Sequence, residues 1–269
     1  MTGMWRLSAV YEKFARPQLM VCAAAILIVA ANYLVTPEII RPAQASPVPV
    51  IQPIEPKVQS ITVTEPMPAP IDCAKVACIA LTFDDGPKAE VTPRVLDILD
   101  KYNAKATFFL VGLHVQGNEE LVRRIHKSGH EIGNHTWSHR RLSELSPQEV
   151  EDDIARAQNV ITATGVPAPH LLRPPYGDFS AMVRSHVPMS VVSWNIDPED
   201  WKAKKPQKII DHVLAHARSG SIVDLHDIYP ITADALEPII ASLQQTYHLV
   251  TVSELLNLPP GQPGIFYGR

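Results

Sequence analysis

Two pairs of side chains have the residue types and spacing of a metal-dependent hydrolytic site. Asp84 and Asp85 stand together at the end of an apolar run, where a Gly-Pro pair turns the chain. His135 and His139 are four residues apart, a spacing that places two imidazoles on one helical face. A set of Asp85, His135 and His139 leaves one coordination position open, as in catalytic zinc sites. We therefore predict a divalent metal on these three residues, with Asp84 reaching the same site in another role; a plain polar turn is the alternative.

A rigid loop, Arg173–Gly177 (RPPYG), follows a short apolar pair of leucines. Its two prolines stiffen the backbone, and Gly177 permits a tight turn. Such a loop can aim a backbone N–H at a developing oxyanion. Arg173 can pair with a carboxylate and keep it ionised. The alternative is that the loop is a structural turn with no chemical role.

A histidine near the end of the chain could supply a proton. His226 directly follows the predicted strand Ser221–Leu225, and the carboxyl end of such a strand suits a general acid. Asp200 could orient His226 by accepting a hydrogen bond from its other ring nitrogen. Trp201 could form the wall of a sugar pocket, although a tryptophan in an α/β domain can equally belong to the core.

Five segments, TFDDGP, HTWSH, RPPYG, DW and LHD, occur in this order. In order and spacing they resemble the motifs of the NodB-type polysaccharide deacetylases, carbohydrate esterase family 4, over roughly Cys78 to Leu256. The resemblance implies an α/β fold, a distorted and incomplete (β/α) barrel, usually with seven strands. It also implies a metal-dependent hydrolase that removes N-acetyl groups from amino sugars of a cell-wall polysaccharide, with Zn²⁺ or alternatively Co²⁺ as cofactor. The polymer would be peptidoglycan or a chitin-like oligomer.

The same resemblance implies a role for each residue of the site beyond the three metal ligands. Asp84 would be the catalytic base, with Arg173 tuning it. His226 would be the general acid, supported by Asp200. The backbone N–H of Tyr176 would help to hold the oxyanion. Beyond the roles that the resemblance implies, we expect Pro174, Trp201, Leu225 and Asp224 to contact the substrate.

One position departs from the family pattern. Relatives usually have an aliphatic residue two positions before the histidine of the last motif, and this chain has Asp224 there. In a regular strand, Asp224 and His226 share a face. We therefore expect Asp224 to line the pocket and to raise the pKa of His226. The alternatives are a bulge that turns Asp224 away or a basic residue, such as Arg173, that neutralises it.

Alternating strands and helices must position these residues, and the pattern predicts a parallel sheet with its chemistry at the carboxyl ends of the strands. The predicted strands are Cys78–Phe83, Ala106–Val111, Leu171–Leu172, Ser190–Trp194, Ser221–Leu225 and His248–Thr251. The predicted helices are Thr92–Tyr102, Glu119–Ser128, Pro147–Thr162, Gln207–Ala217 and Ala233–Thr246. The helix at Pro147 has the sequence of a capping box, Ser-Pro-Gln-Glu.

The N-terminal quarter of the chain predicts a membrane-tethered domain outside the cytoplasm. Residues 19–35 are almost wholly apolar and follow three basic residues, which indicates an anchor with a cytoplasmic N-terminus. Cleavage after Ala45 is the alternative, since Ala43 and Ala45 form an A-x-A pattern. The expected divisions are residues 1–36 as stub and anchor, 37–70 as a proline-rich linker, 71–258 as the catalytic domain and 259–269 as a C-terminal tail.

Composition narrows the remaining choices. A net charge of −4 gives no basis for nucleic-acid binding. Cys73 and Cys78 are close enough in an exported protein to predict a disulfide. We expect a monomer. Two other functions stay open: an O-acetyl esterase acting on xylan or another acetylated glycan, and a carbohydrate-binding relative without catalysis, against which the full set of acid, base and ligand residues argues.

Overall fold

The computed structural model describes residues 71–178, 180, 185–187 and 189–269. The expected anchor, its Ala45 cleavage site and the proline-rich linker lie outside these residues. Within them, no helix has the length and apolar character needed to cross a membrane.

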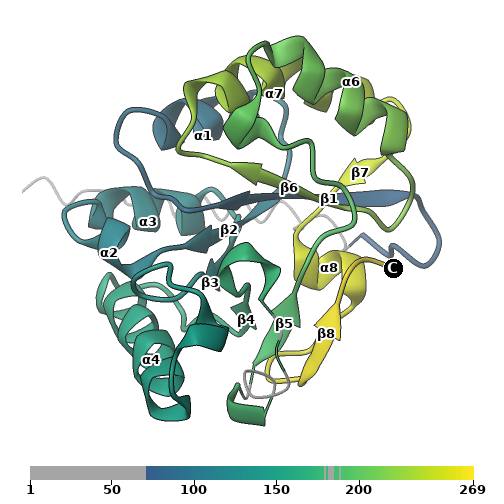
Figure 1. Ribbon diagram of the computed structural model, residues 1–269. Coiled ribbons are helices and arrows are strands. Elements are labelled where there is room, and N and C mark those ends of the chain that lie inside the picture. The colour runs from purple at the N-terminus through teal and green to yellow at the C-terminus, as the bar shows by residue number, and fades with distance from the viewer. Residues whose placement is uncertain (1–70, 179, 181–184, 188) are drawn as a thin grey trace, which may run out of the picture. The chain divides into compact units, whose positions relative to one another are not determined.

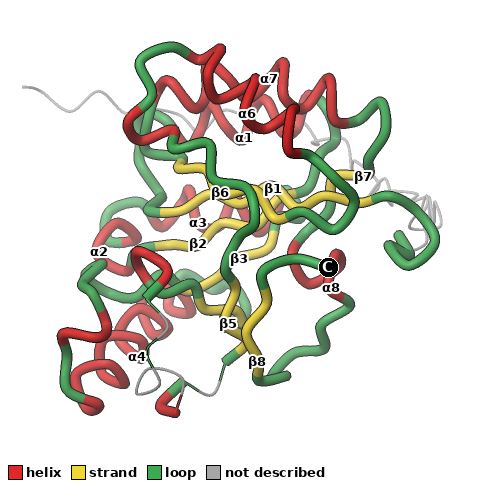
Figure 2. The backbone as a smooth tube through the Cα atoms, turned by 45° about the vertical axis from the view of Figure 1, so that its right-hand side comes forward, coloured by secondary structure: helices red, strands yellow, loops and turns green. Residues whose placement is uncertain are grey.

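The fold is built on a parallel sheet that curls into an open barrel (Figures 1 and 2). Its strands are β1 (Cys78–Asp84), β2 (Ala106–Leu110), β3 (Glu131–Asn134), β4 (Leu171–Leu172), β5 (Ser190–Val192), β6 (Ile222–His226), β7 (His248–Leu249) and β8 (Gly264–Phe266). They pair in the order β6-β1-β2-β3-β4-β5-β8, and β7 also pairs with β1. Every pairing is parallel, which confirms the expected α/β fold with an incomplete barrel.

Helices cover the outside of this sheet. They are α1 (Thr92–Lys101), α2 (Gly112–Val115), α3 (Glu119–Lys127), α4 (Pro147–Ala163), α6 (Pro206–His216), α7 (Pro230–Leu243) and α8 (Val252–Leu256). In Figure 1, α1, α6 and α7 gather over β1 and β6, while α4 lies beside β3 and β4. The capping box that begins α4 is formed: Ser146 accepts from the Glu149 N–H, and Glu149 bonds back to the Ser146 N–H.

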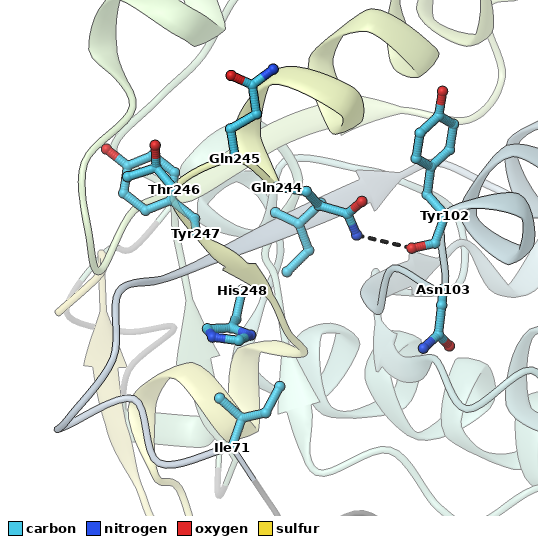
Figure 3. Close-up of a pocket in the computed structure, with 9 residues that line it drawn as sticks. Ile71, Tyr102, Asn103, Gln244, Gln245, Thr246, Tyr247 and His248 are labelled. Atoms are coloured by element: carbon cyan, nitrogen blue, oxygen red, sulfur yellow. Dashed lines mark hydrogen bonds between the residues drawn. The ribbon is translucent and has the colours of Figure 1, made fainter.

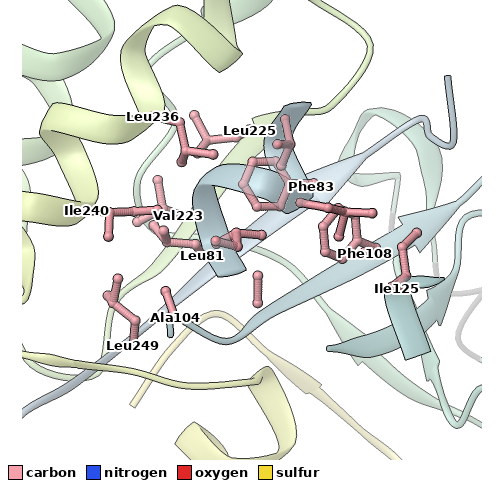
Figure 4. Packing of buried hydrophobic residues seen from close by; sticks show 14 of the residues in the cluster. Leu81, Phe83, Ala104, Phe108, Ile125, Val223, Leu225, Leu236, Ile240 and Leu249 are labelled. Carbon is pink, nitrogen blue, oxygen red and sulfur yellow. The ribbon is translucent and has the colours of Figure 1, made fainter. Parts of the chain in front are cut away.

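The main core lies between the sheet and its helices. Strand β1 is buried at every residue because it has partners on both sides. Figure 4 shows Phe83 of β1 packed beside Phe108 of β2, with Val223 and Leu225 of β6 against Leu236 of α7. Alternate residues of β1 and β6 therefore serve the core, which directs the residues between them to the interior of the barrel.

Two short segments pair with β6 and β5, the first and the last of the consecutive strands from β6 to β5. Ile196 forms a parallel bridge to Val223, and its carbonyl accepts a hydrogen bond from the Asp224 N–H at 2.8 Å. Strand β8, which lies inside the expected C-terminal tail, pairs with β5. The end of the chain is therefore part of the sheet, and its last residue donates from the Arg269 N–H to the Gly220 carbonyl at 2.9 Å.

Candidate active site

Strand register brings the candidate base and acid to the same edge of the sheet. In the pairing of β1 with β6, Asp84 lies opposite His226 and Thr82 lies opposite Asp224. A cavity of about 630 Å³ opens at this edge. Eight residues predicted from sequence line it: Asp84, Asp85, His135, His139, Tyr176, Trp201, Asp224 and His226. The carboxyl ends of the strands thus form the candidate site, as expected for a parallel barrel.

Asp85, His135 and His139 converge as a metal site requires. Their nearest nitrogen and oxygen atoms all lie within 4.8 Å of one another. His139 Nε2 is 3.1 Å and His135 Nε2 is 3.4 Å from Asp85 Oδ1. Ligands about 2.0–2.2 Å from a tetrahedral zinc ion have separations of this size. Asp85 Oδ1 is also buried without a hydrogen-bond partner, so the three residues fit a divalent ion.

The two histidines reach this position from a loop rather than from a helix, which corrects the expectation. Residues 135–141 after β3 have no helical structure, and Thr136 and His139 have positive φ angles of 65° and 55°. Asp153 of α4 holds the loop by accepting from the N–H groups of Trp137 and Ser138 at 2.8 and 3.2 Å. Left-handed backbone at non-glycine residues costs energy and persists where surrounding contacts enforce it, often at functional sites.

Hydrogen bonds orient the ligands. His135 Nδ1 lies 2.6 Å from the Arg173 carbonyl, to which it can only donate, so Nε2 is left with its lone pair toward Asp85 and a metal. Burial opposes ionisation of Asp85, but the two adjacent imidazoles favour its charged form, outweigh burial and hold the pKa of Asp85 well below its ordinary value. Asp85 is therefore an anion, the form that binds a cation.

Arg173 is fully buried and lies behind the cavity rather than on its wall. Its Nη1 donates to Asp84 Oδ1 at 2.7 Å, to Asp224 Oδ1 at 2.9 Å and to Thr82 Oγ1 at 2.8 Å. Its other nitrogens donate to the carbonyls of Val192 and Ser193. One guanidinium thus fixes two carboxylates at the floor of the site.

Asp224 combines two of the outcomes considered from sequence. It lies on the cavity face of β6 together with His226, as a regular strand requires, and it is also paired with Arg173. Burial raises the pKa of Asp224 well above its ordinary value, and the charge of Asp84 adds to this, whereas Arg173 opposes it. The floor of the pocket is therefore polar in either protonation state.

His226 is held by a buried carboxylate. Its Nδ1–H donates to Asp200 Oδ1 at 2.7 Å, and its backbone N–H donates to Asp200 Oδ2 at 2.8 Å. Thr232 also donates to Oδ2, at 2.6 Å. Burial lowers the pKa of His226, but the hydrogen bond and charge of Asp200, with smaller contributions from Asp224 and Asp84, raise it to about 10. His226 is therefore a protonated donor at neutral pH.

Two turns shape the mouth of the cavity. Tyr176, in the turn Pro175–Gly177, has a positive φ of 61° and an exposed side chain whose ring lies edge-on to His139, 4.8 Å between centroids. At the turn after Asp85, a Cβ added to Gly86 would come within 2.3 Å of Asp227 Oδ1. Asp227 is fully buried, so only glycine fits there.

Two residues expected to contact the substrate do not line the cavity. Leu225 is fully buried and belongs to the hydrophobic core, because it lies between Asp224 and His226 on a strand whose side chains alternate. Pro174 is buried, and its carbonyl accepts from the Gly177 N–H at 3.1 Å within the turn. Asp200 lies behind His226, 1% exposed.

Sequence reasoning missed four residues of the cavity wall: Arg141, Trp194, Asp197 and Tyr229. Each lies within five residues of a strand end or a motif histidine, which is the signal that could have found them. The predicted cysteine pair, for its part, is bonded: the sulfur atoms of Cys73 and Cys78 are 2.10 Å apart, beside the start of β1.

A second hollow, of about 530 Å³, lies near the amino ends of β2 and β7 (Figure 3). Tyr102, Asn103 and Gln244 line part of it, and Gln244 donates to the Tyr102 carbonyl at 2.9 Å. The chemistry-bearing residues predicted from sequence are all elsewhere. The cavity at the carboxyl ends of the strands is therefore the candidate active site.

Comparisons with known proteins agree with this assignment. Residues 72–188 match the polysaccharide deacetylase family model. The chain is 46% identical over 178 residues to the peptidoglycan-N-acetylmuramic acid deacetylase PdaC of Bacillus subtilis, covering 66% of this chain and 38% of that protein. It therefore spans well under half the length of that relative. The solved structure of PdaC matches with a TM-score of 0.67 and 44% identity, over 70% of this chain and 93% of the solved one.

Two further relatives differ in what they act on. A family 4 acetyl xylan esterase from Clostridium thermocellum, solved with a cobalt ion, matches with a TM-score of 0.67 and 36% identity, over 71% of this chain and 98% of that one. A peptidoglycan-N-acetylglucosamine deacetylase of Bacillus cereus is 43% identical over 187 residues, covering 66% of this chain and 87% of that protein. With the five motifs, the curled parallel sheet and these relatives, the chain belongs to the polysaccharide deacetylase family, carbohydrate esterase family 4.

Proposed function

We propose that this protein removes N-acetyl groups from amino sugars of a cell-wall polysaccharide, either peptidoglycan or a chitin-like oligomer. The observation that carries the proposal is the pairing of Asp84 with His226 across β1 and β6, in a cavity that also holds Asp85, His135 and His139. A base and an acid on adjacent strand ends can act on the two sides of one acyl group.

The chain's own residues divide the reaction between them. Asp84, fixed by Arg173, takes a proton from the attacking water. The Tyr176 backbone N–H stabilises the developing oxyanion. His226, protonated and fixed by Asp200, gives a proton to the departing nitrogen. An amine is a poor leaving group without that proton, and a pKa of about 10 keeps His226 charged when the amide is cleaved.

We propose that Asp85, His135 and His139 bind a divalent ion, most simply Zn²⁺, with Co²⁺ as a substitute. Two imidazoles and one carboxylate form a donor set that suits zinc and leaves a position open. Such an ion supplies Lewis acidity toward a carbonyl oxygen and lowers the pKa of a water molecule.

Acetate release tests the proposal. Purified protein with added Zn²⁺ or Co²⁺ should release acetate from peptidoglycan or from chitin oligomers, and Asp84→Asn should not. Acetylated xylan belongs in the same assay, because one relative is an acetyl xylan esterase. If acetate is released faster from xylan than from both amino-sugar polymers, the protein is an O-acetyl esterase and not an N-deacetylase. Binding without release from any polymer would indicate a non-catalytic relative.

We also propose that the catalytic domain works as a monomer outside the cytoplasm, anchored by residues 19–35. The support is the apolar run with basic residues on its N-terminal side. Full-length protein should stay in the membrane fraction, with its domain accessible to external protease. A mature protein that begins near Ser46 would instead indicate a cleaved signal peptide.

A further inference from the structure

The wall of the candidate active site carries one strong cation. Among the described residues that line the cavity are four aspartates and three histidines, but Arg141 is the one arginine or lysine. The four carboxylates have partners of their own. Asp84 and Asp224 are held by Arg173, and Asp85 faces the two metal-binding histidines. Asp197 accepts a hydrogen bond from the Glu199 N–H at 2.7 Å. The charge of Arg141 is therefore not needed to neutralise the site.

Arg141 has no carboxylate partner among the described residues, although its neighbour has two. Arg140 lies 3.7 Å from Glu149 and 3.4 Å from Asp153, outside the cavity. No hydrogen bond or ion pair to the Arg141 side chain occurs within the described part of the chain, and the residue is exposed. It is a cation directed at the cavity with its donors unused.

An aromatic ring holds Arg141 in place. Its guanidinium carbon lies 4.4 Å from the centre of the Tyr176 ring, and that ring is edge-on to His139. Stacking orients a guanidinium and leaves its N–H fork free for a planar anion. The cation thus stands one ring away from a metal ligand, on the side of the cavity where the acyl oxygen is expected.

The position limits what the cation can recognise. In a 2-acetamido sugar, the acetamide is on C2, and the substituent on the neighbouring carbon C3 lies next to it. N-acetylmuramic acid carries a carboxylate there, on its lactyl ether, whereas N-acetylglucosamine has a hydroxyl. Asp197, which also lines the cavity, would repel an anion placed beside it.

We propose that Arg141 recognises a carboxylate next to the reacting acetamide, so that the protein prefers an N-acetylmuramic acid unit to N-acetylglucosamine. This inference rests on the proposed deacetylase function. The carboxylate belongs either to the lactyl group itself or to a peptide attached to it. Both present the same chemistry to a guanidinium, and the substrates of the test separate them.

The test compares substrates that differ in this charge. They are a chitin tetramer, a glycan tetramer with free lactyl carboxylates, the same glycan with those carboxylates amidated, and one with peptides attached. Arg141→Met keeps the apolar stem over Tyr176, and Arg140→Met is the matched control. The preference of the enzyme is the kcat/KM for the anionic glycan divided by the kcat/KM for the chitin tetramer. We expect Arg141→Met to lower this preference about tenfold or more, mainly by raising KM for the anionic glycan. Arg141→Lys should restore part of the preference.

The outcomes separate the role of Arg141 from the function itself. An unchanged ratio in Arg141→Met, or an equal fall for both glycans, would mean that the arginine only supports Tyr176. Preference for the peptide-bearing glycan over the free lactyl one would assign the carboxylate to the peptide. Recognition can also be measured without catalysis, by calorimetric binding of both glycans to Asp84→Asn and to the double variant Asp84→Asn/Arg141→Met. If the wild type releases no acetate, only the proposed function is overturned, and this binding measurement still tests the role of Arg141.

Discussion

Replacing Asp200 with asparagine should move the alkaline limit of activity. Asp200 Oδ2 accepts two hydrogen bonds, from the His226 N–H at 2.8 Å and from Thr232 at 2.6 Å. An asparagine must place its carbonyl oxygen there, so its NH₂ group faces His226 Nδ1. Nδ1 then has to accept rather than donate. The substitution therefore removes both the charge and the acceptor that favour a protonated imidazole.

The size of the effect follows from the pKa of His226. Burial alone lowers that pKa, and Asp200 is the largest influence raising it, to a net value of about 10 from an ordinary 6.5. The difference corresponds to about 5 kcal/mol in favour of the charged ring. Without Asp200, burial is opposed only by the more distant Asp224 and Asp84, and we expect the pKa to fall to about 6.5 or lower.

The assay is kcat/KM for acetate release between about pH 5.5 and 10.5. The acid must be protonated to act, so its pKa sets the alkaline limb of the profile. The wild type should stay active to about pH 10. In Asp200→Asn the limb should move below about pH 7, and at about pH 8.5 the loss should reach about 100-fold, against a much smaller loss at about pH 6. Asp197→Asn, which removes a cavity carboxylate not bonded to His226, is the control.

An alkaline limb that stays in place in Asp200→Asn would refute the reasoning, because it would mean that His226 is not the titrating acid. A uniform loss at all pH values would point to displacement of His226 rather than to its pKa. Circular dichroism of the variant separates either result from unfolding.

The remaining predictions concern the metal, the base, the pocket floor and acid stability. His139→Ala should lose both bound zinc and activity, measured by metal analysis, whereas Asp84→Asn should lose activity and keep the metal; equal metal loss would mean that the ligands are misassigned. Asp224→Asn removes a charge that raises the pKa of His226, so the alkaline limb should move to lower pH, by less than in Asp200→Asn. Burial lowers the pKa of His130 to about 4, so the stability gained from its neutral ring is complete above pH 6.5 and is lost as the pH falls through about 4. Between about pH 6.5 and pH 4, the free energy of unfolding of the wild type should therefore fall by about 3 kcal/mol more than that of His130→Leu. If the free energy of unfolding changes equally with pH in the two proteins, the prediction is wrong.

Local signals in the sequence were sufficient for much of the fold. The apolar run of β1, the capping box at Ser146 and the amphipathic helices α1 and α3 each depend on residues close together in the chain, and each formed within a residue or two of its predicted bounds. Strand β3 was missed. It is four residues long and contains Gly133, where a Cβ would meet the Phe109 ring at 2.3 Å; that demand comes from a neighbouring strand and leaves no local pattern.

Local signals in the sequence also identified the residues that carry the chemistry of the site. Two adjacent aspartates, two histidines four apart and a histidine after a strand define the chemistry by their types and positions in the chain. Their spacing did not reveal how the histidines converge, because a loop held by Asp153 replaces the expected helix. Leu225, expected at the substrate, does not line the cavity, because a motif does not say which of its side chains face the core.

Only the tertiary structure decided which distant residues share the cavity. The register of β1 against β6 sets Asp84 beside His226 and lets Arg173, from a third strand end, hold two carboxylates at once. Arg141 owes its position to the ring of Tyr176, which lies far from it in the chain. Strand pairing and side-chain stacking of this kind depend on contacts between segments far apart in sequence, so composition and spacing specified the reacting groups while packing specified their neighbours.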